Sequence, residues 1–138
     1  MRYYLDTNIL VFILFKETDS ISHTVVDILG DYSNTLITSS VAVRELIFLY
    51  KTGKLRSKLY NTVDDLTAEI KKLNIEIIQF NNYHLQVYSK LAIVEKHKDM
   101  NDHAIISQAI SDKIALVSSD NEFKSYTSQG LNFIFNKR

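Results

Sequence analysis

Short apolar runs alternate with longer amphipathic stretches along the chain. The runs with the length and residue types of β-strands lie at 2–5, 35–38, 75–80, 114–118 and 131–135. The stretches between them have helical spacing and predict helices near 7–15, 20–31, 40–52, 55–72, 83–97, 101–112 and 120–128. Strands joined by helical crossovers form a mainly parallel sheet, and strands that are apolar nearly throughout indicate helices on both faces. The pattern therefore predicts an α/β fold.

The composition predicts one globular domain over residues 1–138, with 46% hydrophobic and 23% charged residues. The chain has no Cys, which excludes thiolate chemistry and fits a reducing compartment. The longest apolar run, Ile9–Phe15, is too short to span a bilayer, and no targeting segment is recognisable. We therefore expect a cytoplasmic protein that does not enter a membrane. The 16 basic and 16 acidic residues balance, which argues mildly against tight nonspecific binding of nucleic acid.

Glycine motifs that serve other α/β enzymes are missing from this chain. It has three Gly and contains no G-x-G-x-x-G, G-x-x-x-x-G-K-[ST] or G-x-S-x-G sequence. Dinucleotide binding, P-loop nucleotide binding and the hydrolase nucleophile elbow are therefore disfavoured. The remaining candidate chemistry is that of carboxylates.

Two acids directly follow predicted strands. Asp6 comes after strand 2–5, and Asp120 comes after strand 114–118. Carboxyl ends of parallel strands meet at one edge of a sheet, where ligands bind, so the two side chains are candidate neighbours. The alternative is that each acid only caps the helix that follows it, because Asp is a preferred N-cap residue.

Two further acids lie on apolar helix faces. Asp102 is in line with Ile105 and Ile106, and Glu45 stands between Val43 and Leu46. The alternatives are stabilisation of Asp102 by the helix dipole and pairing of Glu45 with a nearby cation. If all four acids converge, like charges ~6 Å apart repel by roughly 3 kcal/mol per pair at an effective dielectric constant of about 20. Such a cluster requires bound cations or protonated carboxyls, and its hard oxygen ligands favour Mg²⁺ or Mn²⁺.

Four short segments resemble motifs of the PIN-domain family, in particular the VapC-like toxins. They are Leu5-Asp6-Thr7-Asn8-Ile9-Leu10, Ser40-Val41-Ala42-Val43-Arg44-Glu45-Leu46, Asn101-Asp102-His103-Ala104-Ile105-Ile106 and Val117-Ser118-Ser119-Asp120-Asn121-Glu122-Phe123. Each motif is weak alone, but their order and spacing are jointly specific. The resemblance covers roughly residues 3–136. It implies a single-domain PIN-like fold with a five-stranded parallel sheet in the order 3-2-1-4-5, flanked by about seven helices.

The resemblance implies that Asp6, Glu45, Asp102 and Asp120 are catalytic and hold the metal. Asn8 matches the polar residue that supports the first acid, and Ser119 matches the small hydroxyl residue before the last. The implied activity is hydrolysis of RNA phosphodiester bonds by a metal-activated water, with transfer RNA as one substrate class. A cognate antitoxin is the implied protein partner, and a homodimer stays open.

A run of basic residues is a candidate for guiding RNA phosphates toward these acids. It consists of Lys51, Lys54, Arg56 and Lys58, and the alternative is an ordinary solvated surface. The four His residues show no metal-binding spacing, so we expect surface or core roles for them.

Two other functions are weighed against the nuclease. A phosphatase of the haloacid dehalogenase type requires a second Asp at position 8, where this chain has Asn8. A catalytically silent PIN fold that binds RNA or protein has no need for all four acids.

Overall fold

Parallel strands form one sheet in the computed structural model, which describes residues 1–138. The sheet has five strands in the order β3-β2-β1-β4-β5. They are β1 (Arg2–Leu5), β2 (Thr35–Ser39), β3 (Glu76–Ile78), β4 (Ala115–Ser118) and β5 (Phe133–Phe135). The predicted fold class and strand order are confirmed.

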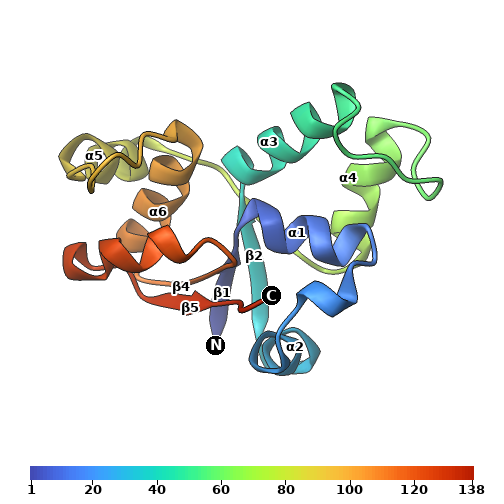
Figure 1. Ribbon diagram of the computed structural model, residues 1–138, viewed down its shortest axis with the longest axis horizontal. Helices are drawn as coiled ribbons and strands as arrows, with labels where there is room; N and C mark the ends of the chain where they lie inside the picture. The colour runs from blue at the N-terminus through green and yellow to red at the C-terminus, as the bar shows by residue number, and fades with distance from the viewer.

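Helices cover both faces of the sheet. They are α1 (Thr7–Leu14), η1 (Thr18–Ser20), α2 (His23–Gly30), α3 (Ser40–Lys51), α4 (Val63–Lys72), α5 (Asn82–Lys90), α6 (Met100–Asp112) and η2 (Asn121–Gln129), where η denotes a 3-10 helix. Figure 1 shows α1 to α4 on one side of the sheet and α5 and α6 on the other. None of these helices is long and apolar enough to cross a membrane.

Three helix predictions differ from the structure. The predicted helix 55–72 begins only at Val63, because Thr62 adopts an extended conformation and its hydroxyl caps the Asp65 N–H at 3.1 Å. The predicted helix 83–97 ends at Lys90, and the Gln129 side-chain amide then bonds both backbone groups of Ala92 at 2.9 Å. The predicted α-helix 120–128 is the 3-10 helix η2.

The pairing of the central strands brings the ends of β1 and β4, which precede Asp6 and Asp120, to one edge of the sheet. In β1, Leu5 pairs with Thr38 of β2 and with Val117 of β4. Leu5, Leu116 and Val117 are almost fully buried, and burial of each such side chain contributes roughly 1.5–3 kcal/mol. This register brings the carboxyl ends of β1 and β4 to the same level. Asp6 and Asp120, just beyond those ends, therefore face a common space.

Candidate active site

Asp6 lies at the end of β1 and is the most buried of the predicted acids, with 3% exposure. It is the N-cap of α1, and its Oδ1 accepts the Thr7 N–H at 2.8 Å. Its Oδ2 accepts the Ser118 hydroxyl at 2.6 Å and the Asn8 Nδ2–H at 3.2 Å. Capping therefore uses one oxygen, while the other belongs to a polar network between β1 and β4.

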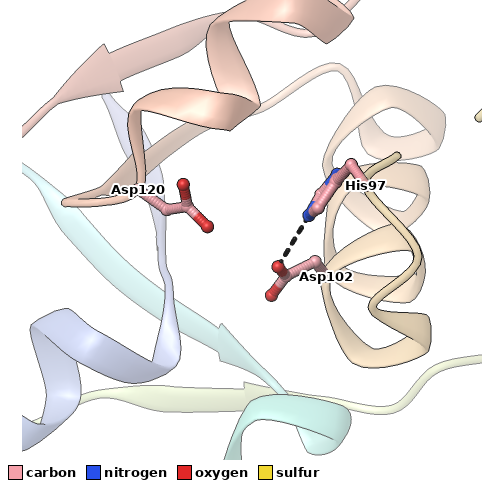
Figure 2. Close-up of side chains that lie close together, drawn as sticks. All are labelled: His97, Asp102 and Asp120. Atoms are coloured by element: carbon pink, nitrogen blue, oxygen red, sulfur yellow. Dashed lines mark hydrogen bonds and ion pairs between the residues drawn. The ribbon is translucent and has the colours of Figure 1, made fainter. Parts of the chain in front are cut away.

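Asp102 and Asp120 lie at two other helix starts. Asp99 caps α6 by accepting the Asp102 N–H at 3.1 Å, which places Asp102 in the first turn of that helix. Asp120 caps η2 by accepting the Glu122 N–H at 2.9 Å. In Figure 2 the carboxylates of Asp102 and Asp120 point into the same space, together with the ring of His97. One nitrogen or oxygen atom from each of these three side chains lies within 4.8 Å of the other two.

Glu45 projects from α3 and completes the set. It forms no ion pair with Arg44 or Lys51; instead Asn101 Nδ2 donates to Glu45 Oε2 at 3.3 Å, and Arg44 Nη2 donates to Asn101 Oδ1 at 3.0 Å. Asn101 thus joins α3 to the start of α6, next to Asp102. The four predicted acids line one cleft of about 350 Å³, together with Thr7, Asn8, Val11, Phe12, Leu49, Leu55 and Arg138.

Two of these carboxyls have raised pKa values. Burial raises the pKa of Asp6 from 3.8 to about 7, against the lowering effect of the Ser118 hydrogen bond, and the nearby charges of Asp102 and Glu45 add to the rise. Burial also raises the pKa of Asp102 from 3.8 to about 6, partly offset by the hydrogen bond from His97. Without a cation, the cleft therefore opposes full ionisation of its own acids.

The lining of the cleft fits a hard divalent cation. Its charged donors are carboxylate oxygens, with no sulfur ligand, which is the chemistry that Mg²⁺ and Mn²⁺ prefer. One polar atom in the wall also lacks a partner: Thr7 Oγ1 is the only buried side-chain oxygen or nitrogen without a hydrogen bond. Buried hydroxyls are normally satisfied, so this unpaired hydroxyl is an exception, and it belongs to a residue that lines the cleft.

The polar support of Asp6 involves one predicted residue and one that was not predicted. Asn8 contacts Asp6, and its Oδ1 also accepts the Ser119 N–H at 3.1 Å. The hydroxyl that reaches Asp6 belongs to Ser118, whereas the Ser119 hydroxyl accepts the Asn136 Nδ2–H at 2.6 Å. Ser118 is the last residue of β4, and successive side chains along a strand point to opposite faces of the sheet, so two adjacent hydroxyls do not both reach Asp6.

The basic run lies beside the acid cleft. Lys51 ends α3, and Lys54, Arg56 and Lys58 are exposed on the irregular segment that leads to α4. Leu55 of this segment lines the cleft, and Lys54 lines an adjoining hollow that it shares with Glu45. Contact with RNA remains a prediction for these four residues.

His97 is a site neighbour that the sequence analysis did not single out. It precedes α6, and its Nε2 lies 2.9 Å from Asp102 Oδ2. The side chain is 9% exposed, and its Nε2 also lies 3.5 Å from Glu122 Oε2. Its position five residues before Asp102 was visible in the sequence, but the fold of the connecting segment was not.

Comparisons with known proteins place the chain in a structural context. A family model described as PIN domain matches residues 3–128. VapBC2 from Rickettsia felis, solved bound to a DNA fragment from its promoter, is 24% identical, with 99% of this chain and 100% of that chain covered at a TM-score of 0.69. VapBC-1 from nontypeable Haemophilus influenzae is 19% identical, with 98% of each chain covered at a TM-score of 0.66. DNA-bound VapBC from Salmonella typhimurium is 16% identical, with the same coverage and a TM-score of 0.66. No match is found among curated proteins.

Proposed function

The chain belongs to the PIN-domain family, and from its acid cleft we propose that it is a divalent-metal-dependent ribonuclease. The observation that carries this proposal is the convergence of Asp6, Glu45, Asp102 and Asp120 on one cleft. These acids come from four separate segments of the chain. Helix capping alone gives no reason for their carboxylates to meet.

The proposed ligands of the metal are these four carboxylates. A bound Mg²⁺ or Mn²⁺ would polarise the scissile phosphate and lower the pKa of a water molecule. The protein keeps the carboxylate of Asp6 in place through Ser118 and Asn8. Arg138 supplies the one cationic side chain in the cleft wall, where it can attract the phosphate backbone.

The proposed biological setting is a toxin–antitoxin pair. It follows from the resemblance to VapC-like toxins, in which RNA is the substrate and the antitoxin blocks the site. The similar solved chains come from structures described as VapBC and FitAB, which agrees with this setting. A cytoplasmic location, transfer RNA as a substrate class and a homodimer are parts of the same proposal.

An RNA cleavage assay tests the function directly. The protein is stripped of metal with EDTA, and total RNA is then incubated with added Mg²⁺ or Mn²⁺ and its new ends are mapped. We expect metal-dependent cleavage by the parent protein and none by Asp6→Asn or Asp102→Asn. The matched control is Asp27→Asn, which changes an exposed Asp of α2 outside the cleft and should cleave like the parent.

Two results would contradict the proposal. Cleavage retained by well-folded Asp6→Asn and Asp102→Asn proteins would remove the acids from the chemistry. RNA binding without cleavage under all metal conditions would favour the silent PIN scaffold. The phosphatase alternative is excluded by family membership.

A further inference from the structure

We propose that His97 is a positioning residue that holds Asp102 by donating a hydrogen bond from its Nε2–H, and that it is not itself a metal ligand. This inference rests on the proposed function insofar as Asp102 is taken as a ligand. His97 lies on the segment between α5 and α6, and its Nε2 is 2.9 Å from Asp102 Oδ2. The contact is shown in Figure 2.

The hydrogen atoms around Tyr126 determine which ring nitrogen of His97 carries the proton. His103 Nε2 lies 2.8 Å from the backbone oxygen of His97, and a carbonyl only accepts, so His103 Nε2 is a donor. That nitrogen is also 3.2 Å from the Tyr126 hydroxyl. A second donor, the Val94 N–H, reaches the same hydroxyl at 3.3 Å. Neither neighbour can therefore accept the hydrogen of the Tyr126 hydroxyl.

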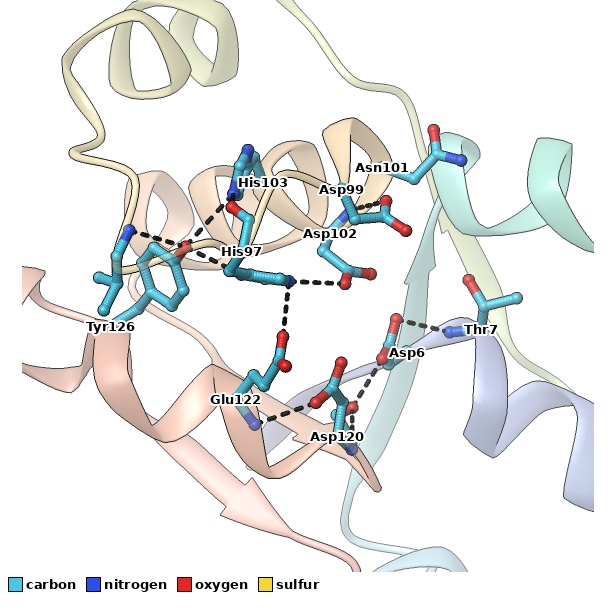
Figure 3. Close-up of polar contacts among 12 residues, drawn as sticks. Asp6, Thr7, His97, Asp99, Asn101, Asp102, His103, Asp120, Glu122 and Tyr126 are labelled. Atoms are coloured by element: carbon cyan, nitrogen blue, oxygen red, sulfur yellow. Dashed lines mark hydrogen bonds and ion pairs between the residues drawn. The ribbon is translucent and has the colours of Figure 1, made fainter.

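The Tyr126 hydroxyl then has a single acceptor for its own hydrogen. This acceptor is His97 Nδ1, at 2.9 Å (Figure 3). In neutral His97 the proton consequently sits on Nε2 and points to Asp102. The opposite tautomer would give the Tyr126 oxygen three donors and leave its hydrogen without an acceptor.

With this tautomer, His97 supports Asp102 by a hydrogen bond, and the carboxylates alone are left to bind the proposed metal. Nε2 of His97 has no lone pair to offer, although it lies near the oxygens of Asp102 and Asp120. The hydrogen bond occupies Asp102 Oδ2 and leaves Oδ1 without a partner. The ligand set is then made of oxygens only. Tyr126 and His103, both buried, fix the ring of His97 in turn.

The experiment compares two substitutions at position 97. His97→Leu fills similar space but removes the donor, and His97→Gln keeps an N–H near the place of Nε2. Loss of a residue that hydrogen-bonds a metal ligand typically weakens metal binding about 10–100-fold. We expect a loss of this size for His97→Leu and substantial recovery for His97→Gln, measured by Mn²⁺ titration followed by electron paramagnetic resonance.

A second His–Asp pair provides a matched control. His84 Nε2 lies 2.9 Å from Asp112 Oδ1, and His84 is buried, whereas His97 is half-buried. Asp112 is ten residues beyond Asp102 on α6, or about 15 Å along the helix axis. His84→Leu should therefore lower the melting temperature but leave the Mn²⁺ affinity of the folded protein unchanged.

The tautomer is read independently by nitrogen-15 NMR of the histidine rings in metal-free protein, at about pH 8 where His is ordinarily neutral. A proton on Nδ1 of His97 would overturn the inference, as would parent-like Mn²⁺ affinity in His97→Leu. Coupling of the Mn²⁺ electron spin to a histidine nitrogen would show that His97 is a ligand and would overturn the inference as well. If the parent protein bound no Mn²⁺, the proposed function would fail instead, while the NMR result would still decide the tautomer.

Discussion

The charge of Asp6 should destabilise the metal-free protein at neutral pH, and Asp6→Asn should reveal by how much. Asp6 is 3% exposed, and its pKa rises from 3.8 to about 7 on folding, chiefly through burial. At 1.36 kcal/mol per pKa unit, ionised Asp6 costs the folded state about 4 kcal/mol. The cost is absent below about pH 3.8, where both states are protonated, and fully present above about pH 7. Through this group, stability therefore falls as pH rises across that window.

Asn removes the charge but does not fit the surrounding hydrogen bonds fully. Its oxygen can still cap Thr7, but its amide nitrogen replaces the Oδ2 that accepts from Ser118 and Asn8. Leaving such buried donors unmatched costs about 1–3 kcal/mol. Asp6→Asn should thus be more stable than the parent by about 1–3 kcal/mol at pH 8, and less stable by a similar amount at pH 4.

Thermal unfolding in EDTA between pH 4 and pH 8 measures this difference. For a chain of 138 residues, about 1 kcal/mol corresponds to roughly 3 °C in melting temperature. We expect Asp6→Asn to melt roughly 3–10 °C above the parent at pH 8 and below it at pH 4. Asp27→Asn, on the exposed side of α2, is the control and should show no crossing. A difference that stays constant over the whole pH range would refute the reasoning.

Three further predictions concern metal and RNA. Mn²⁺ at about 100 times its dissociation constant should stabilise the parent protein by about 2.7 kcal/mol, which raises its melting temperature by roughly 8 °C. Identical melting curves in EDTA and in Mn²⁺ would contradict a shared metal site. Because Mn²⁺ must displace protons from Asp102 and Asp6, with pKa values of about 6 and about 7, its affinity should rise with pH and level off above about pH 7. Calorimetry in buffers of different ionisation enthalpy checks this, and no proton release at pH 6 would count against it. Replacing the basic run by Gln should weaken RNA binding and reduce the slope of log affinity against log salt concentration. The slope should fall by roughly 0.7–0.9 per lost contact, or about 3 in total. An unchanged slope in binding titrations would show that the run is an ordinary solvated surface. The four residues are Lys51, Lys54, Arg56 and Lys58.

The sheet was predictable because each strand is marked in the sequence by a short apolar run. Apolar runs such as 114–118 are too short for helices and are buried on both faces, so their position and parallel direction follow from pattern and connection length. The helix ends were less predictable. Val63 begins α4 after a local cap by Thr62, whereas Lys90 ends α5 just before Ala92, which Gln129 holds from a distant part of the chain. Periodicity within a window contains no information about such contacts.

The convergence of the four acids on one cleft was predictable, and so was the contact of Asn8 with Asp6, but the other partners of the acids were not. Asp6 and Asp120 follow buried strands, so sheet topology alone brings them to one edge. The Ser118 hydroxyl reaches Asp6 and the Ser119 hydroxyl reaches Asn136, a difference that two adjacent Ser residues in a sequence do not reveal. His97 contacts Asp102 only because the segment before α6 leaves the helical path after Lys90. Both features require the three-dimensional course of the backbone.

Capping and metal binding, weighed as alternatives from the sequence, are compatible at this site. An N-cap carboxylate uses one oxygen for the helix and directs the other away from it, as Asp6 does toward Ser118. Helices that start beside the carboxyl ends of parallel strands therefore deliver carboxylate oxygens to the same edge of the sheet. The helix N-termini also favour negative charge there, which lowers the cost of gathering acids before a cation binds. What distinguishes this cleft from a set of ordinary caps is the burial of Asp6, because an exposed N-cap needs neither the raised pKa nor the network around Ser118.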